Sequence, residues 1–221
     1  MQRLILLVVL MLAPAIARAQ SFWAGALSQY ITENGVVLHD RPVFQADAFW
    51  SLSHGGYVDL WASRSVDGRN SELDYTVGWS SKFADVSVAY FDLEPLWRPN
   101  DIVQTKVQFM FPKKVGAHEL VGYVALNHMR PRDDPSKNSG DFVRVGLSDT
   151  WVLNSGTTIR QHAWLLHDSG VFQGEEGFLA RYEAGVRFRR GSYTLEPFIR
   201  LSVPFVSDRH TEVVAAVRLL R

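Results

Sequence analysis

The chain has 221 residues, of which 47% are hydrophobic and 21% are charged, and it contains no cysteine. This length fits one or two ordinary domains. The absence of cysteine excludes a disulfide-bonded scaffold, a thiolate nucleophile and a cysteine-ligated metal site. Because 23 basic residues balance 23 acidic ones, the charge indicates neither a nucleic-acid partner nor a polybasic membrane anchor.

The first residues have the pattern of a secretory signal peptide. Arg3 supplies the positive charge, residues 4–12 form an apolar run, and residues 17–19 have the small-x-small form of a cleavage site. The run is far shorter than the ~20 residues of a membrane-spanning helix. We therefore predict a signal peptide at 1–19 and a mature chain of 202 residues, 20–221, with a formal net charge of −2. No cysteine follows the run, so the sequence predicts export without a lipid anchor.

The rest of the chain has the pattern of β-strands. Apolar and polar residues alternate with a period of two, and clusters of Gly, Asn, Asp, Ser and Pro separate the segments. Twelve strands are predicted, at 21–32, 43–53, 57–65, 72–83, 86–93, 101–112, 118–129, 141–151, 157–168, 178–188, 192–202 and 210–220. Their lengths centre on the ~9–11 residues that a tilted strand needs to cross a bilayer. The even number and the lack of a linker favour one barrel domain.

The connections between these strands alternate in length. They are short at 54–56, 84–85, 113–117, 152–156 and 189–191, and longer at 33–42, 66–71, 94–100, 130–140, 169–177 and 203–209. Short periplasmic turns and longer extracellular loops are typical of outer-membrane barrels. The predicted fold class is therefore all-β, an antiparallel up-and-down transmembrane β-barrel of about 12 strands in the cell outer membrane.

Each predicted strand has one apolar and one polar face. In 178–188, Phe178 and Tyr182 alternate with Arg181 and Glu183. The strands 21–32, 86–93, 118–129 and 157–168 alternate less regularly. Twelve strands enclose more volume than one layer of apolar side chains can fill, so we predict that the apolar face contacts lipid and that the polar face lines a hydrated lumen. The alternative is two packed sheets with the apolar faces in a shared core.

Aromatic residues recur on the apolar face next to the short turns. They are Trp50, Phe83, Phe111, Trp151, Phe188 and Tyr193. Such rings lie at the headgroup level of a membrane. They predict a periplasmic aromatic girdle.

The stretch from Gln29 to Trp79 carries a series of spaced motifs. It contains Gly35, Pro42-Val43-Phe44-Gln45, Gly56-Tyr57, Trp61-Ala62-Ser63, Glu72-Leu73-Asp74 and Gly78-Trp79. This pattern resembles the TorF-type porin family of small proteobacterial outer-membrane proteins, over about the first third of the mature chain. The resemblance implies a barrel through which solutes diffuse. Such barrels usually end in an aromatic residue that the barrel assembly machinery reads, whereas this chain ends in Leu219-Leu220-Arg221.

The charges on the polar faces are sorted by sign along the chain. Asp47, Asp59, Glu72 and Asp74 come from the early strands, and Lys106, Arg144, Arg160, Arg181, Arg187, Arg200 and Arg218 from the later ones, opposed by Glu183, Glu196 and Glu212. Around a narrow lumen this arrangement creates a transverse field that orients zwitterionic solutes and favours anions. We predict a passive, monomeric channel for small solutes. The alternative is a structural barrel that its own ion pairs plug.

An enzymatic alternative depends on His167 and Ser169. Their His-x-Ser spacing resembles that of outer-membrane lipid A deacylases, and their equal parity would let the side chains meet. The Asn that normally follows the serine is Gly170 here, and the candidate carboxylates are Glu175 and Glu176 in the following loop. We therefore predict no catalysed reaction and keep a lipid hydrolase as the alternative.

Other polar residues give weaker indications. His162 and His167 lie five apart on one strand and point to opposite faces, so the sequence predicts no metal site, and no cofactor. Asp133 and Asp134 in a long loop could hold calcium, and nearby arginines could contact lipopolysaccharide phosphates, or the loop is only solvated. Pro197 faces lipid and predicts a bulge or an imperfectly paired position. The expected partners are outer-membrane lipid and lipopolysaccharide, the barrel assembly machinery and small solutes.

Overall fold

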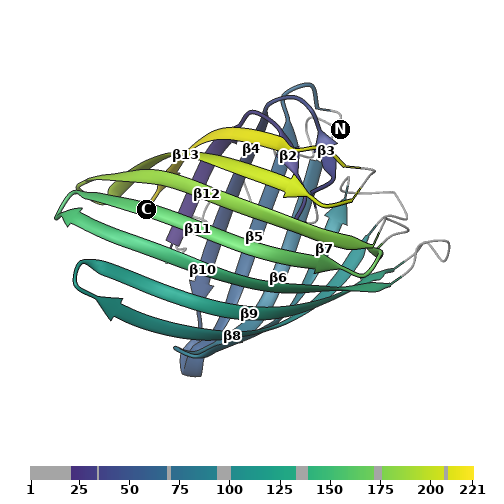
Figure 1. Ribbon diagram of the computed structural model, residues 1–221, viewed down its shortest axis with the longest axis horizontal. Helices are drawn as coiled ribbons and strands as arrows, with labels where there is room; N and C mark the ends of the chain where they lie inside the picture. Colours follow the sequence, from purple (N-terminus) through teal and green to yellow (C-terminus); the bar gives the residue numbers. More distant parts are fainter. Residues whose placement is uncertain are drawn as a thin grey trace.

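The computed structural model describes residues 21–33, 35–68, 71–93, 101–132, 139–171, 176–206 and 209–221, shown in Figure 1. The predicted signal peptide lies outside the described residues. The barrel strands are β1 (Ser21–Leu27), β4 (Val43–Ser51), β5 (Gly56–Ser65), β6 (Ser71–Ser80), β7 (Ala84–Leu93), β8 (Ile102–Val115), β9 (His118–Pro131), β10 (Gly140–Asn154), β11 (Thr157–Asp168), β12 (Gly177–Arg190), β13 (Tyr193–Pro204) and β14 (Glu212–Leu220).

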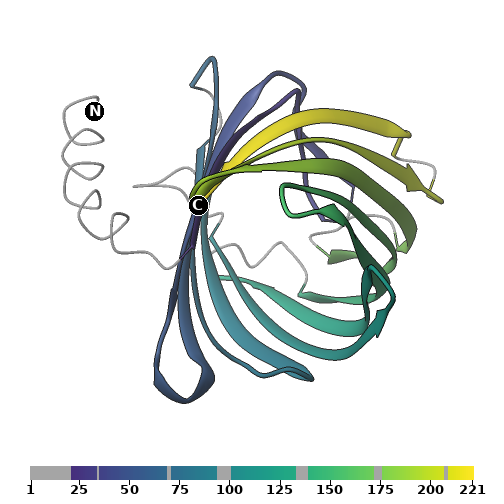
Figure 2. The ribbon, with the colours of Figure 1, turned by 90° about the vertical axis from the view of Figure 1, so that its left-hand side faces the viewer.

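These twelve strands form one closed antiparallel barrel in which each strand pairs with its neighbours in the chain. The ring closes where β1 pairs with β14, from Trp23 opposite Leu220 to Leu27 opposite Ala216. Phe22 and Arg221 extend this seam with two backbone hydrogen bonds of 3.1 and 2.8 Å. Figure 2 shows the curved wall from a second direction. The predicted fold class is confirmed, and the alternative of two packed sheets is wrong.

The two ends of the barrel differ in their connections, as predicted. At one end, which we call the turn end, the strands are joined by short turns such as residues 116–117, 155–156 and 191–192, while longer connections lie at the other, the loop end. Gly116 and Gly191 have φ of 59° and 64°, a conformation that tight turns require and that glycine adopts without strain. Within the described residues, no helix is long and apolar enough to span a membrane.

The first predicted strand, 21–32, is wrong at its end, and so is the interpretation of 33–42 as a plain loop. β1 ends at Leu27, and β2 (Tyr30–Ile31) and β3 (Val37–His39) pair as a separate small sheet, which lies at the loop end of the barrel (Figure 1). Ile31 is buried with Leu27, Val43 and Val214. The alternation of apolar and polar residues continues through the bend after Leu27, so the sequence pattern does not show where the barrel strand ends. We call residues 28–33 and 35–40 the strap.

Exposure separates the two faces of the wall. Tyr75, Val77 and Trp79 are exposed on β6, whereas Glu72 at the start of that strand is buried. On β12, Phe178, Tyr182 and Phe188 are likewise exposed while Arg181 and Glu183 are buried. The apolar face therefore points outward, as predicted.

The expectation of a uniformly polar lumen is wrong near the loop end. An apolar cluster covers the inner face of β8 to β11, formed by Ile102, Tyr123, Ala125, Met129, Phe142, Trp164, Leu166 and Val171. β9 and β11 correspond to two of the predicted strands that alternate poorly. Their poor alternation has a physical cause, because apolar residues occupy both faces there. Part of the enclosed volume is thus filled by side chains rather than by water.

Pro197 interrupts the ladder between β12 and β13 without shifting it. Pairs are formed up to Gly185 opposite Phe198 and resume at Phe188 opposite Leu195 in the same register. Pro197 still lies opposite Val217 on the β14 side. Its missing N–H explains the imperfectly paired position, which was one of the two predicted outcomes.

Two lumen tyrosines lie over glycines of the neighbouring strand. Tyr57 is paired with Gly78, and Tyr123 with Gly146. A Cβ added at either glycine would come within 2.4 Å of the ring. Each glycine therefore provides the space in which a large ring lies flat against the wall.

Gly146→Ala should destabilise the barrel by about 1–3 kcal/mol, because the methyl group forces the Tyr123 ring away. The measurement is the urea dependence of refolding in detergent micelles. Gly122→Ala is the matched control, since its Cβ would meet only Phe111 Cβ at 4.0 Å, and it should change stability by less than about 0.5 kcal/mol. Equal effects of the two substitutions would contradict this packing argument.

Candidate functional site: the charged lumen

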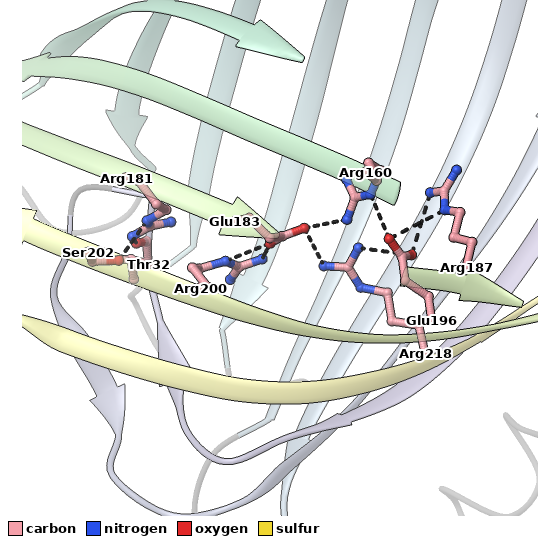
Figure 3. A network of polar contacts seen from close by, with 9 residues as sticks. All are labelled: Thr32, Arg160, Arg181, Glu183, Arg187, Glu196, Arg200, Ser202 and Arg218. Carbon is pink, nitrogen blue, oxygen red and sulfur yellow. Dashed lines mark hydrogen bonds and ion pairs between the residues drawn. The ribbon is translucent and has the colours of Figure 1, made fainter. Parts of the chain in front are cut away.

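The later strands carry a network of arginines around two buried glutamates, Glu183 and Glu196 (Figure 3). Arg160 Nε donates to Glu196 Oε1 at 2.6 Å, and Arg187 Nε lies 3.3 Å from the same oxygen. Glu196 is 0% exposed. A carboxylate this deeply buried depends on its charged partners, because it has lost its hydration.

Glu183 occupies the other half of the network. Arg200 donates to Glu183 Oε2 through Nη2 at 2.7 Å and through Nε at 2.9 Å. Arg218 Nη2 lies 3.4 Å from Oε1, and Arg160 also donates to that oxygen. All these residues lie on β11 to β14, so the ion pairs run along one wall. With four arginines on two glutamates, this wall keeps an excess of positive charge.

The opposite wall is acidic. Asp47, Asp59, Glu72 and Asp74 lie on β4, β5 and β6, and the backbone register places Asp47 and Asp74 on either side of Trp61. Within the described residues, no lysine or arginine lies within ion-pair distance of these four carboxyl groups. β5 lies six strands from β11 in either direction around the ring, so the acidic wall and the β11 side of the basic wall face each other across the lumen.

Between these two walls lies a transition on β7 and β8. Lys106 Nζ lies 2.8 Å from Asp85 Oδ1, and Tyr57 donates to the same oxygen at 3.4 Å. Asp85 is a buried lumen carboxylate that the sequence interpretation missed, because it was assigned to a turn. Lys106 is thus neutralised locally by Asp85, and the excess of positive charge lies on β11 to β14.

The strap crosses the lumen and contacts both walls. On the acidic side, Tyr30 donates to Glu72 Oε2 at 2.5 Å and its ring centroid lies 5.8 Å from that of Trp61. On the basic side, Arg144 Nη1 donates to Glu33 Oε1 at 3.0 Å. Arg144 also lowers the pKa of the Glu33 carboxyl below its ordinary value, so this strap residue remains ionised.

Two further contacts fix the strap. Arg181 Nη2 donates to the carbonyl oxygen of Thr32 at 2.6 Å, and Gln29 Nε2 donates to Glu212 Oε2 at 2.8 Å. Glu212 was predicted to line the lumen, and it holds the strap at the β14 side. Residues 28–33 carried no signal that could reveal this role, since they continue the alternation of the preceding strand.

The aromatic residues of the predicted girdle lie near the turn end. Five of them are exposed on the outer face: Phe83, Phe111, Trp151, Phe188 and Tyr193. Trp50 is half-buried and lies opposite the outward-facing Val58. The ring of His118 stacks on Trp151 with centroids 5.3 Å apart. Lipid contact by these rings stays a prediction.

In the described part of the chain, His167 and Ser169 each contact other residues rather than one another. His167 Nε2 lies 3.4 Å from Glu176 Oε1, and its ring packs on Phe178 on the outer face. Ser169 Oγ accepts a hydrogen bond from the Asp141 N–H at 2.8 Å. His162, by contrast, lies against Tyr123 inside the barrel, with Nε2 at 2.8 Å from the hydroxyl, so the two histidines occupy opposite faces as predicted. Asp133 and Asp134 lie outside the described residues.

Comparisons with known proteins give a fold but no family. No family model and no curated protein matches the sequence. The NanC porin is 7% identical, with a TM-score of 0.58 over 90% of this chain and 97% of that chain. The KdgM porin is 6% identical, with a TM-score of 0.56 over 90% and 97%. An outer membrane channel from Pseudomonas putida F1 is 9% identical, with a TM-score of 0.50 over 92% and 95%. The chain therefore has the fold of small outer-membrane β-barrels.

Glu196→Gln should reduce the stability of the barrel by about 3 kcal/mol, because it leaves buried guanidinium groups without their counter-charge. Reversible urea unfolding in micelles measures this change. Glu119→Gln is the control, since Glu119 is exposed and its carboxylate lies 3.5 Å from Lys114 Nζ at the turn end, and it should cost less than about 1 kcal/mol. An unaltered midpoint for Glu196→Gln would show that the arginines do not need this carboxylate.

Proposed function

We propose that the protein is an outer-membrane channel for the passive diffusion of small solutes, with a preference for anionic and zwitterionic ones. The observation that carries this proposal is the sorting of charge by sign on facing walls. A lumen lined in this way has a transverse field, since its low-dielectric wall screens the charges poorly. The similarity in fold to the porins named above supports the proposal.

The arginine network accounts for the predicted sign of selectivity. Each glutamate on β12 and β13 is shared between several guanidinium groups, so the wall stays positive after pairing. Among the residues that the structure describes, the acidic wall has no such counter-ions. Anions are therefore attracted to the β10 to β14 wall, and the acidic wall turns the positive end of a zwitterion towards itself.

The remaining parts of the proposal concern the setting of the channel. We propose a monomer, exported by its cleaved signal peptide at 1–19, inserted by the barrel assembly machinery and surrounded by lipid and lipopolysaccharide. Membership of the TorF-type porin family also belongs to the proposal. The channel needs no catalysed reaction. Release of fatty acid from lipid A or phospholipid by the purified protein, lost in Ser169→Ala, would favour the hydrolase instead.

Conductance in planar bilayers across a KCl gradient tests the channel. We expect unitary currents whose reversal potential indicates chloride preference. Arg187→Gln combined with Arg200→Gln should lower the chloride-to-potassium permeability ratio about twofold or more, because two lumen charges are lost. Arg189→Gln together with Arg190→Gln, at exposed positions of the turn end, removes the same charge and should leave the ratio unchanged.

Two results would contradict the proposal. The absence of unitary current from a refolded, heat-modifiable barrel would remove the channel and leave only the fold. A clear preference for cations would refute the role assigned to the arginine wall.

A further inference from the structure

The strap presents two acceptors to two arginines of the basic wall. The Glu33 carboxylate accepts from Arg144, and the Thr32 carbonyl accepts from Arg181. Both arginines come from barrel strands, whereas both acceptors come from a short segment that is not part of the wall. The strap therefore contacts these two arginines as a ligand would, through single acceptor groups and without pairing to the strands that carry them.

The barrel holds both guanidinium groups without help from the strap. Arg181 Nε donates to Ser202 Oγ at 2.8 Å, and its guanidinium carbon lies 5.2 Å from the centroid of the Trp164 ring. Arg144 lies over the Tyr123 ring at 5.6 Å. Aromatic faces favour such cations and limit their rotation. The site is thus preorganised, so a different acceptor could replace the strap at little cost in side-chain ordering.

The same place contains buried donors that the strap does not satisfy. In the part of the chain that the structure describes, neither Arg144 Nε nor Trp164 Nε1 has a hydrogen-bond acceptor, although both atoms are buried. They lie close to each other along the wall, since Trp164 pairs with Gly146, two residues from Arg144. A buried donor without an acceptor is destabilising, because it has lost its hydration without gaining a partner. Two such donors beside two arginines favour an anion with more than one oxygen.

We propose that Arg144, Arg181 and Trp164 form a binding site for a solute carboxylate, and that Glu33 occupies it when no solute is present. The strap is then a self-bound plug, and a carboxylate that enters from the loop end competes with Glu33 for the guanidinium groups. Release of Glu33 frees the strap on the basic side, while Tyr30 and Gln29 keep it attached elsewhere. This inference rests on the proposed channel and names the solute class and the device that admits it.

The test is a titration of the refolded barrel in detergent with gluconate, followed by tryptophan fluorescence. In Glu33→Gln the internal competitor is weakened, so the half-saturating gluconate concentration should fall about tenfold, as expected when a preorganised site loses its competitor. Glu119→Gln removes the same charge far from the site and should behave like the unmodified protein. Arg144→Gln should abolish the response, and Arg144→Lys should restore part of it.

The outcomes separate the inference from the proposed channel. An unchanged or higher half-saturating concentration in Glu33→Gln would overturn the inference, as would a tighter response to inorganic phosphate than to gluconate. A normal gluconate response in a barrel that conducts no ions would leave the site intact and refute the channel. In bilayers, gluconate should raise the conductance of the unmodified protein more than that of Glu33→Gln, and equal effects on both would again overturn the plug.

Discussion

The structure depends on the requirement that every backbone N–H and C=O within a bilayer be paired inside the protein. Twelve antiparallel strands meet this requirement only when the last strand returns to the first, and the β1–β14 seam with its Phe22–Arg221 extension completes the ring. Closure fixes the circumference of the wall and divides its residues into an outer and an inner set. The other features of the structure concern which side chains occupy the outer face and which occupy the inner face of this wall.

The inner set has to occupy a volume too large for one layer of side chains. The chain fills the loop end with an apolar cluster and with the strap, and it lines the remainder with arginines and carboxylates in separate arcs. Charges buried in this way are costly unless they are paired. Glu183 and Glu196 provide that pairing within the basic wall, so the network stabilises the arginines and at the same time leaves them with excess charge facing the lumen.

The features that depend on the alternation of side chains along a strand could be predicted from the sequence. The number of barrel strands, the alternation of turns and loops, the outward direction of Phe178 and Phe188 and the sorting of charge could be predicted, because they follow from the alternation of side chains along each strand. The strap could not be predicted from the sequence. Its contacts join Tyr30 to Glu72 and Glu33 to Arg144, residues far apart in the chain, and no local pattern distinguishes a strand that continues from one that bends inward. The same holds for Asp85, whose lumen position depends on the exact turn.

The central claim is that the strap lies inside the lumen against the basic wall. Because the chain has no cysteine, the double variant Gly35→Cys with Leu179→Cys can test it directly, since a Cβ at Gly35 would lie 3.8 Å from Leu179 Cγ, the position that a cysteine sulfur takes. A cysteine at the positive φ of Gly35 costs about 1–2 kcal/mol. We predict that mild oxidation of the folded protein forms an intramolecular disulfide, detected by mass spectrometry. Two cysteines that stay reduced, while each reacts with a maleimide, would contradict the account.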